Sequence, residues 1–83
     1  GAAPAPRPSL DHIVVEQAIV GLHTGETGAT LAAQLTASQR ALFLARVPDE
    51  LARLARANLG PDTVAIRARC TARIEAAAAV LRA

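Results

Sequence analysis

The stretch VPDELARLARANLGPD, residues 47–62, indicates one helix that ends and another that is about to begin. Pro48 is suited to the first turn of a helix, where Asp49 and Glu50 would complement the positive end of the helix dipole. Arg53 lies one turn after both acids, so we expect ion pairs on the outer side of this helix. The inner stripe should consist of the apolar residues that recur at helical spacing, Leu51, Leu54 and Ala55.

The end of this stretch predicts a tight hairpin of two helices. Gly60 would supply the left-handed stop of the first helix, with a proline directly after it, and Asp62 would cap the second. The second helix should run from Thr63 to about Leu81. Its apolar residues fall within one sector of about 80° at 3.6 residues per turn, and they are Ile66, Cys70, Ile74, Ala77 and Leu81.

The residues before the hairpin predict a first helix that is apolar on two sides. Ser9 is a suitable N-cap, and the helix should end near Leu22. The two sides carry different residues: Val14, Val15, Ala18, Ile19 and Leu22 on one, Ile13 and Val20 on the other. A helix with two apolar faces is either enclosed within its own fold or shared with a partner.

A further helical region connects this first helix to the hairpin. This region starts near Thr30. Thr36 and Gln39 have the pattern of a capping box, which would begin a new helix at this point. Thr36 therefore either interrupts the helical region or merely lies on its surface. The fold class is therefore all-α: a small antiparallel bundle of four helices, or five if Thr36 breaks the second. We expect one bundle domain over residues 9–83, preceded by a flexible Ala/Pro-rich linker at residues 1–8.

The composition indicates a small soluble domain with a thin core. The chain has 83 residues, of which 52% are hydrophobic, but much of this is alanine and Phe43 is the single aromatic residue. No stretch approaches the roughly 20 apolar residues that span a bilayer, so we expect no membrane partner. One cysteine precludes an internal disulfide and fits a reducing compartment, so we expect a cytoplasmic location. Because the sequence begins at Gly1, we expect a processed chain or a piece of a longer one.

Charge is distributed unevenly along the chain. Residues 9–30 carry acids and no lysine or arginine, whereas eight arginines and four acids follow from Arg40 onward. The chain contains no lysine. Arginine without lysine, together with abundant alanine, indicates the coding bias of a GC-rich genome, so it does not by itself indicate nucleic-acid binding.

The segment HTGETGAT, residues 23–30, is similar to two ligand-binding motifs and satisfies neither. A zinc finger needs paired cysteines, but Cys70 is the only cysteine, and a phosphate loop needs a lysine that the segment lacks. His12 and Glu16 are one turn apart and could share a cation, but His23 lies about 10 Å beyond Glu16 along the helix, too far to bind the same ion. We therefore expect no metal, cofactor or catalytic residues, Cys70 as a small core residue, and no enzymatic activity.

One alternative function is DNA binding. Residues 49–73 resemble a helix-turn-helix, with arginines Arg67, Arg69 and Arg73 on the second helix. The spacing around Gly60 departs from that motif and favours a bundle hairpin. The second helix also lacks the Asn and Gln residues that read bases.

The leading expectation is a non-catalytic domain for protein–protein interaction, acting in docking, as an adaptor or as a small chaperone. Its partner would be another protein, a protein helix or a second copy, giving a homodimer or a hetero-oligomer. Ile13 and Val20 would form the apolar contact, because one small bundle cannot cover both faces of the first helix. Glu16 of one chain would then lie near Arg67 or Arg73 of the other and set the orientation.

Overall fold

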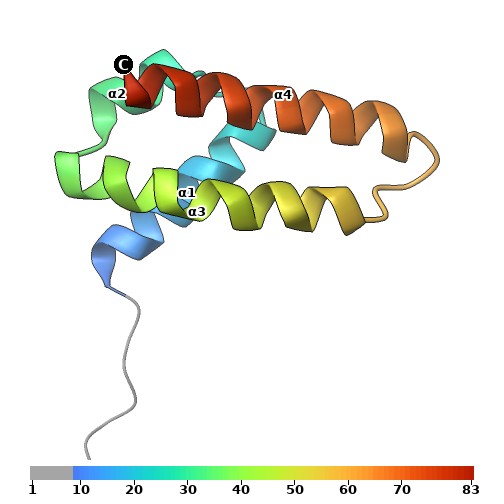
Figure 1. Ribbon diagram of the computed structural model, residues 1–83, viewed down its shortest axis with the longest axis horizontal. Coiled ribbons are helices and arrows are strands. Elements are labelled where there is room, and N and C mark those ends of the chain that lie inside the picture. Colours follow the sequence, from blue (N-terminus) through green and yellow to red (C-terminus); the bar gives the residue numbers. More distant parts are fainter. Residues whose placement is uncertain (1–8) are drawn as a thin grey trace, which may run out of the picture.

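The computed structural model describes residues 9–83, so the expected linker lies outside the described residues. Within them the chain forms four helices and no strand: α1 (Leu10–His23), α2 (Gly28–Gln34), α3 (Ala37–Arg56) and α4 (Thr63–Arg82). The helices α3 and α4 lie side by side and run in opposite directions (Figure 1). Helix α1 packs against both of them, and α2 packs against α4. The predicted all-α bundle is confirmed.

Local capping signals explain where three of the four helices begin. The Ser9 hydroxyl accepts a hydrogen bond from the backbone N–H of His12, and Thr27 caps α2 in the same way. Thr36 forms a complete capping box, in which its own N–H donates to the side chain of Gln39 at 2.9 Å. Thr36 therefore does break the second helical region, because its side chain satisfies a backbone donor at the start of α3.

The prediction that Pro48 begins a helix is wrong. Helix α3 runs through Pro48 without a break. The chain is divided at Thr36 and not at Pro48, and the bundle therefore has four helices. The reason is packing: Phe43, Val47 and Leu54 lie on one continuous buried face that spans the proline. Pro48 itself is exposed, where water can hydrate the carbonyl group that the missing N–H leaves free. Ala55 is also exposed and does not belong to the inner stripe.

The connection between α3 and α4 differs in detail from the sequence prediction. Helix α3 ends at Arg56, so Gly60 is not its stop, although Gly60 has the expected positive φ of 94° within the connection. Asp62 stands at the N-cap position of α4 but makes no capping hydrogen bond. Instead, the Thr63 hydroxyl accepts from the N–H of Leu59 and donates to the carbonyl of Gly60. The Thr63 hydroxyl thus holds the connection together, but it does not take the place of a cap for the N–H groups of α4.

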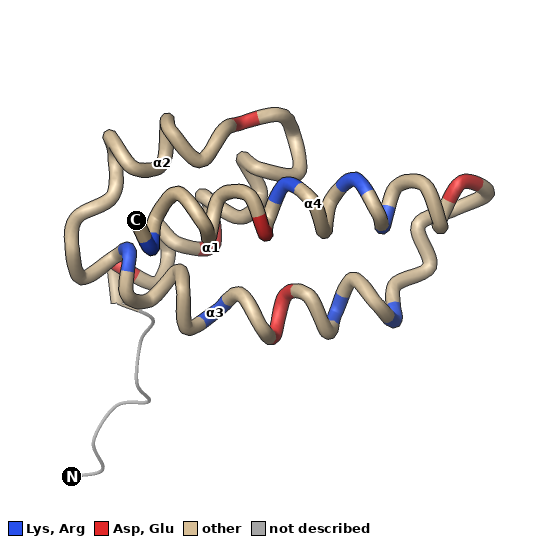
Figure 2. The backbone as a smooth tube through the Cα atoms, turned by 45° about the horizontal axis from the view of Figure 1, so that its top comes forward, with Lys and Arg blue, Asp and Glu red and all other residues tan. Residues whose placement is uncertain are grey.

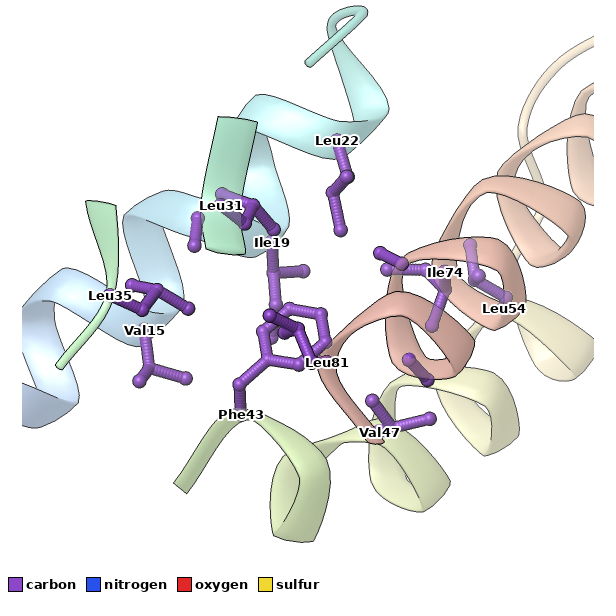
Figure 3. Packing of buried hydrophobic residues seen from close by; sticks show 13 residues of the cluster. Val15, Ile19, Leu22, Leu31, Leu35, Phe43, Val47, Leu54, Ile74 and Leu81 are labelled. Carbon is purple, nitrogen blue, oxygen red and sulfur yellow. The ribbon is translucent and has the colours of Figure 1, made fainter. Parts of the chain in front are cut away.

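The core gathers around Phe43, which is fully buried where α1, α3 and α4 meet (Figure 3). Helix α2 closes this core by packing very near α4, because a Cβ atom at Gly28 would lie 2.9 Å from the Cα atom of Ala77. On α4 only the later part of the predicted stripe is fully buried, since Ile66 and Cys70 are half-buried. The buried apolar residues are Val15, Ala18, Ile19, Leu22, Leu31, Leu35, Phe43, Val47, Leu54, Ile74, Ala77, Ala78 and Leu81.

Candidate protein-docking surface

Helix α1 has a buried face and an exposed apolar face, as its sequence predicts. Its inner residues belong to the core, whereas Ile13 is 45% exposed and Val20 is 60% exposed. Leu10, in the first turn, is 74% exposed. Large apolar side chains that are this exposed and this close together are uncommon on a small monomer unless they serve an interaction.

The exposed apolar residues of α1 are arranged as a regular stripe. Leu10, Ile13, Gln17 and Val20 are spaced three, four and three residues apart, and all four are exposed. At 100° per residue they fall within an arc of about 80°. We refer to these four residues as the outer stripe of α1. An open depression of about 440 Å³ lies against it and is lined by Ile13, Gln17 and Val20, together with His12 and Glu16 beside them.

Two shallower depressions follow the sides of α1. The one toward α2 has a volume of about 230 Å³ and is lined by Gln17, Gly21 and Glu26, among others. The one toward α3 has a volume of about 200 Å³ and is lined by Glu16 and Arg46, among others. The outer stripe is therefore a ridge with a carboxylate on each side.

The predicted rim residue Glu16 already has a partner within its own chain. Its Oε1 atom accepts a hydrogen bond from Nε of Arg46 at 2.7 Å, which ties α1 to α3. The Glu16 side chain nevertheless stays 55% exposed. Because a carboxylate has further acceptor positions, Glu16 is still able to meet a donor from outside.

The other two predicted rim residues lie elsewhere and have structural roles. Arg67 donates hydrogen bonds to the carbonyl oxygens of Leu54 and Ala57, at 2.7 and 2.8 Å, and so satisfies the end of α3. Arg73 donates to the carbonyl oxygen of Leu22 near the end of α1, at 3.4 Å. Arginines suit helix C-termini because unpaired carbonyl groups and the negative end of the dipole are found there. Within one chain Arg67 and Arg73 are therefore engaged away from the outer stripe, and their contact with Glu16 of a second copy stays a prediction.

The arginines of the alternative, DNA-binding reading lie along the hairpin of α3 and α4. Figure 2 shows arginines on both helices toward the connected end of this hairpin. Arg69 is exposed, as is Arg56 on α3, whereas Arg67 and Arg73 are half-buried. The helices α3 and α4 lie antiparallel (Figure 1), while the helices of a helix-turn-helix cross at about 90–120°. The hairpin thus has a basic end without the geometry of that motif.

A buried ionic cluster around Glu50 was not predicted. Glu50 is only 1% exposed, and its carboxylate takes two hydrogen bonds from Arg53, at 2.9 and 2.6 Å. Nε2 of His23 lies 2.7 Å from the same carboxylate, and Arg46 donates to it at 3.3 Å. The hydrogen bonds from Arg53 are the main reason that the pKa of Glu50 is lowered to about 2, against the opposing effect of burial.

The sequence did contain a signal for this burial. Glu50 falls three residues after Val47 and four before Leu54, so it lies on the same face as the core residues of α3. The expected ion pair with Arg53 exists, but its carboxylate is buried and also meets His23, whereas the Arg53 side chain stays 52% exposed. The cluster fastens the end of α1 to the middle of α3, and hence it holds the outer stripe in place.

The remaining candidate residues are not assembled into a site. Among residues 9–83 there is no group of three or more His, Cys, Asp or Glu side chains that could share a metal ion. Cys70 is half-buried and packs against the core. The HTGETGAT segment forms the turn after α1 and the first turn of α2, with a φ of 118° at Gly25.

Within residues 9–83, no helix combines the length and the apolar character that a membrane crossing needs. Comparison with known proteins gives no relative: no family model matches the chain, and neither a curated protein nor a solved structure shows significant similarity to it.

Proposed function

We propose that this chain is a non-catalytic protein-interaction domain that binds a helix through the outer stripe of α1. The observation that carries the proposal is the exposure of Leu10, Ile13 and Val20 at helical spacing on one side of a well-anchored helix. Burying two or three such side chains against a partner would contribute several kcal/mol, at about 25 cal/mol per Å² of apolar area. The helix would come from another protein or from a second copy.

The proposal gains support from the way α1 is held. Its inner face is packed into the core, and its end is fastened to α3 by the contact between His23 and Glu50. A partner would therefore meet a preformed ridge, which keeps the entropic cost of binding low. Docking, adaptor and chaperone-like roles all fit a surface of this kind.

Sedimentation velocity tests the proposal. We expect the mass of the wild type to rise with concentration, because an uncovered apolar stripe favours self-association even when its main partner is another protein. Ile13→Asp/Val20→Asp should be a folded monomer, and Val64→Asp is the matched control, since Val64 is 79% exposed on α4. An unfolded double variant would show that these side chains stabilise the fold itself. Self-association that the double variant retains would place the docking surface elsewhere.

DNA binding by the arginines of α4 is the second candidate. It is favoured by the five arginines and single acid, Asp62, between residues 51 and 74. The hydrogen bonds of Arg67 and Arg73 to backbone carbonyls speak against it, because those side chains are already engaged. Salt-dependent retention on duplex DNA distinguishes the two candidates.

A further inference from the structure

We infer that the occupant of the outer stripe is a basic amphipathic helix from a different protein, with apolar residues at heptad spacing and Arg or Lys on both sides of them. This inference rests on the proposed function and specifies its partner. Three features of the stripe specify this partner: its spacing, the polar residue at its centre, and the charges beside it.

The spacing of the stripe specifies a helix as the partner. Intervals of three and four residues, as between Leu10, Ile13, Gln17 and Val20, are those of the contact positions in a two-helix seam. A seam of this kind accepts side chains of a facing helix at a crossing angle of about 20°. The stripe covers ten residue steps, or about 15 Å, so two heptads of a partner are enough to cover it.

The centre of the stripe is polar. Gln17 lies between Ile13 and Val20, and it lines both the depression against the stripe and the one on the α2 side of α1. A buried side-chain amide needs hydrogen-bond partners, so the partner should place a polar residue opposite Gln17. A single polar contact of this kind fixes the register of paired helices.

The charged side chains beside the stripe are two carboxylates, Glu16 and Glu26, and one guanidinium, that of Arg46. Helix α1 carries Asp11 and Glu16 and no lysine or arginine. On the side toward α2, Glu26 lies over the helix, since a Cβ atom added at Gly21 would lie 3.0 Å from its Cγ atom. On the other side, the exposed Glu16 shares Arg46 with Glu50. Basic residues that flank the apolar positions of a partner would therefore meet Glu16 and Glu26.

The same charges disfavour a second copy as the preferred occupant. Two α1 helices packed along their outer stripes would bring the Glu16 side chains of both chains to the same rim, where like charges oppose binding. Arg46, which lines the same depression as Glu16, is already bonded to the Glu16 of its own chain. Self-association through the stripe should consequently be weaker than binding of a basic helix.

The test uses two synthetic peptides of three heptads and the 83-residue chain. Both peptides carry Leu at the contact positions and one central Asn; one has Arg and the other has Glu at the flanking positions. Fluorescence anisotropy measures binding to the wild type and to Ile13→Asp/Val20→Asp. We expect the Arg peptide to bind the wild type at least tenfold more tightly than the Glu peptide, and to lose binding to the double variant.

Charge variants test the flanks directly. Glu16→Gln/Glu26→Gln should weaken the Arg peptide about fivefold, as two exposed ion pairs of modest strength predict. Asp62→Asn/Glu75→Gln removes the same charge from exposed positions on and beside α4 and should leave binding unchanged.

The outcomes separate the inference from the proposed function. If the Glu peptide binds as tightly as the Arg peptide, or if Glu16→Gln/Glu26→Gln has no more effect than the control pair, the inference is wrong while the docking surface stands. If neither peptide prefers the wild type to Ile13→Asp/Val20→Asp, and the wild type also stays monomeric, the proposed function fails as well.

Discussion

The Nε2 atom of His23, the last residue of α1, lies 2.7 Å from the Oε2 atom of Glu50, in the middle of α3. Both residues are polar, yet the Glu50 side chain is 2% exposed and that of His23 is 19% exposed. Burial of a carboxylate is tolerated only when it is paired and hydrogen-bonded, and here Arg53 and Arg46 complete the pairing. This contact fixes where α1 crosses α3, and so it determines which face of α1 remains outside.

Glu50→Gln should lower the free energy of unfolding by about 2 kcal/mol, because it removes a buried charge that holds three donors and leaves them incompletely paired. Urea unfolding followed by circular dichroism measures the change. Asp49→Asn is the matched control, since Asp49 is its exposed neighbour, and it should change the free energy of unfolding by less than about 0.5 kcal/mol. Equal effects of the two substitutions would contradict a structural role for the cluster.

Stability should depend on acid pH through the same residue. The pKa of Glu50 is lowered from 4.5 to about 2 in the folded chain. As the pH falls, the Glu50 carboxylate is therefore protonated in the unfolded chain before it is protonated in the folded one. The stabilisation is therefore complete above about pH 4.5 and is lost as the pH falls toward 2. Urea unfolding of the wild type at pH values from 6 to 2 should show this decline. Glu50→Gln should show a smaller decline, and parallel curves for the two proteins would refute the assignment.

Pro48→Ala should stabilise the domain by about 1–2 kcal/mol. Alanine restores the N–H that a helix interior uses and is a far better helix former than proline, although it also makes the unfolded chain more flexible. Thermal unfolding measures the change. Pro61→Ala is the control, because Pro61 lies in the connection outside α3 and α4, and there the substitution should bring no gain. A destabilised Pro48→Ala protein would mean that the proline fits α3 better than an alanine.

The capping sites of the bundle could be predicted from sequence because they depend on residues three positions apart. The capping box of Thr36 and Gln39 is of this kind, and the structure confirms it. The prediction for Pro48 is wrong because the local preference of proline for a helix start is weaker than the packing of one continuous face on both sides of it. Long-range packing decides such cases, and a single sequence does not specify it.

The candidate surface is predictable in part, because helical periodicity is also a local property. It places Ile13 and Val20 on the side of α1 opposite the inner stripe, and both side chains are exposed there. The roles of Arg67 and Arg73 at helix C-termini depend on which helices are neighbours, so the sequence could not show that these side chains are engaged. The burial of Glu50 beside His23 depends on a contact across 27 residues and was missed for that reason.

Two glycines in helical positions should respond to alanine in opposite ways. At Gly28 the new Cβ atom would lie 2.9 Å from the Cα atom of Ala77, a backbone atom that cannot move aside alone. Gly28→Ala should therefore cost about 1–3 kcal/mol of unfolding free energy, as overpacking usually does. At Gly21 the nearest atom belongs to the flexible side chain of Glu26, so Gly21→Ala should be neutral or stabilise by up to about 1 kcal/mol. Chemical denaturation of both variants checks the pair, and a reversed order would exclude the close packing of α2 on α4.

Retention on duplex DNA should be weak and should depend only slightly on salt. Among the arginines at the connected end of the hairpin, Arg56 and Arg69 are exposed, whereas Arg67 and Arg73 are bonded to backbone carbonyls. Two phosphate contacts would give a slope of about −2 in a plot of log affinity against log salt concentration. Filter binding at several salt concentrations measures this slope. The variant Arg56→Ala/Arg69→Ala should no longer be retained on DNA. A slope of about −4, as four phosphate contacts would give, would indicate that Arg67 and Arg73 leave the carbonyls that they satisfy. DNA binding would then replace protein docking as the better account of this chain.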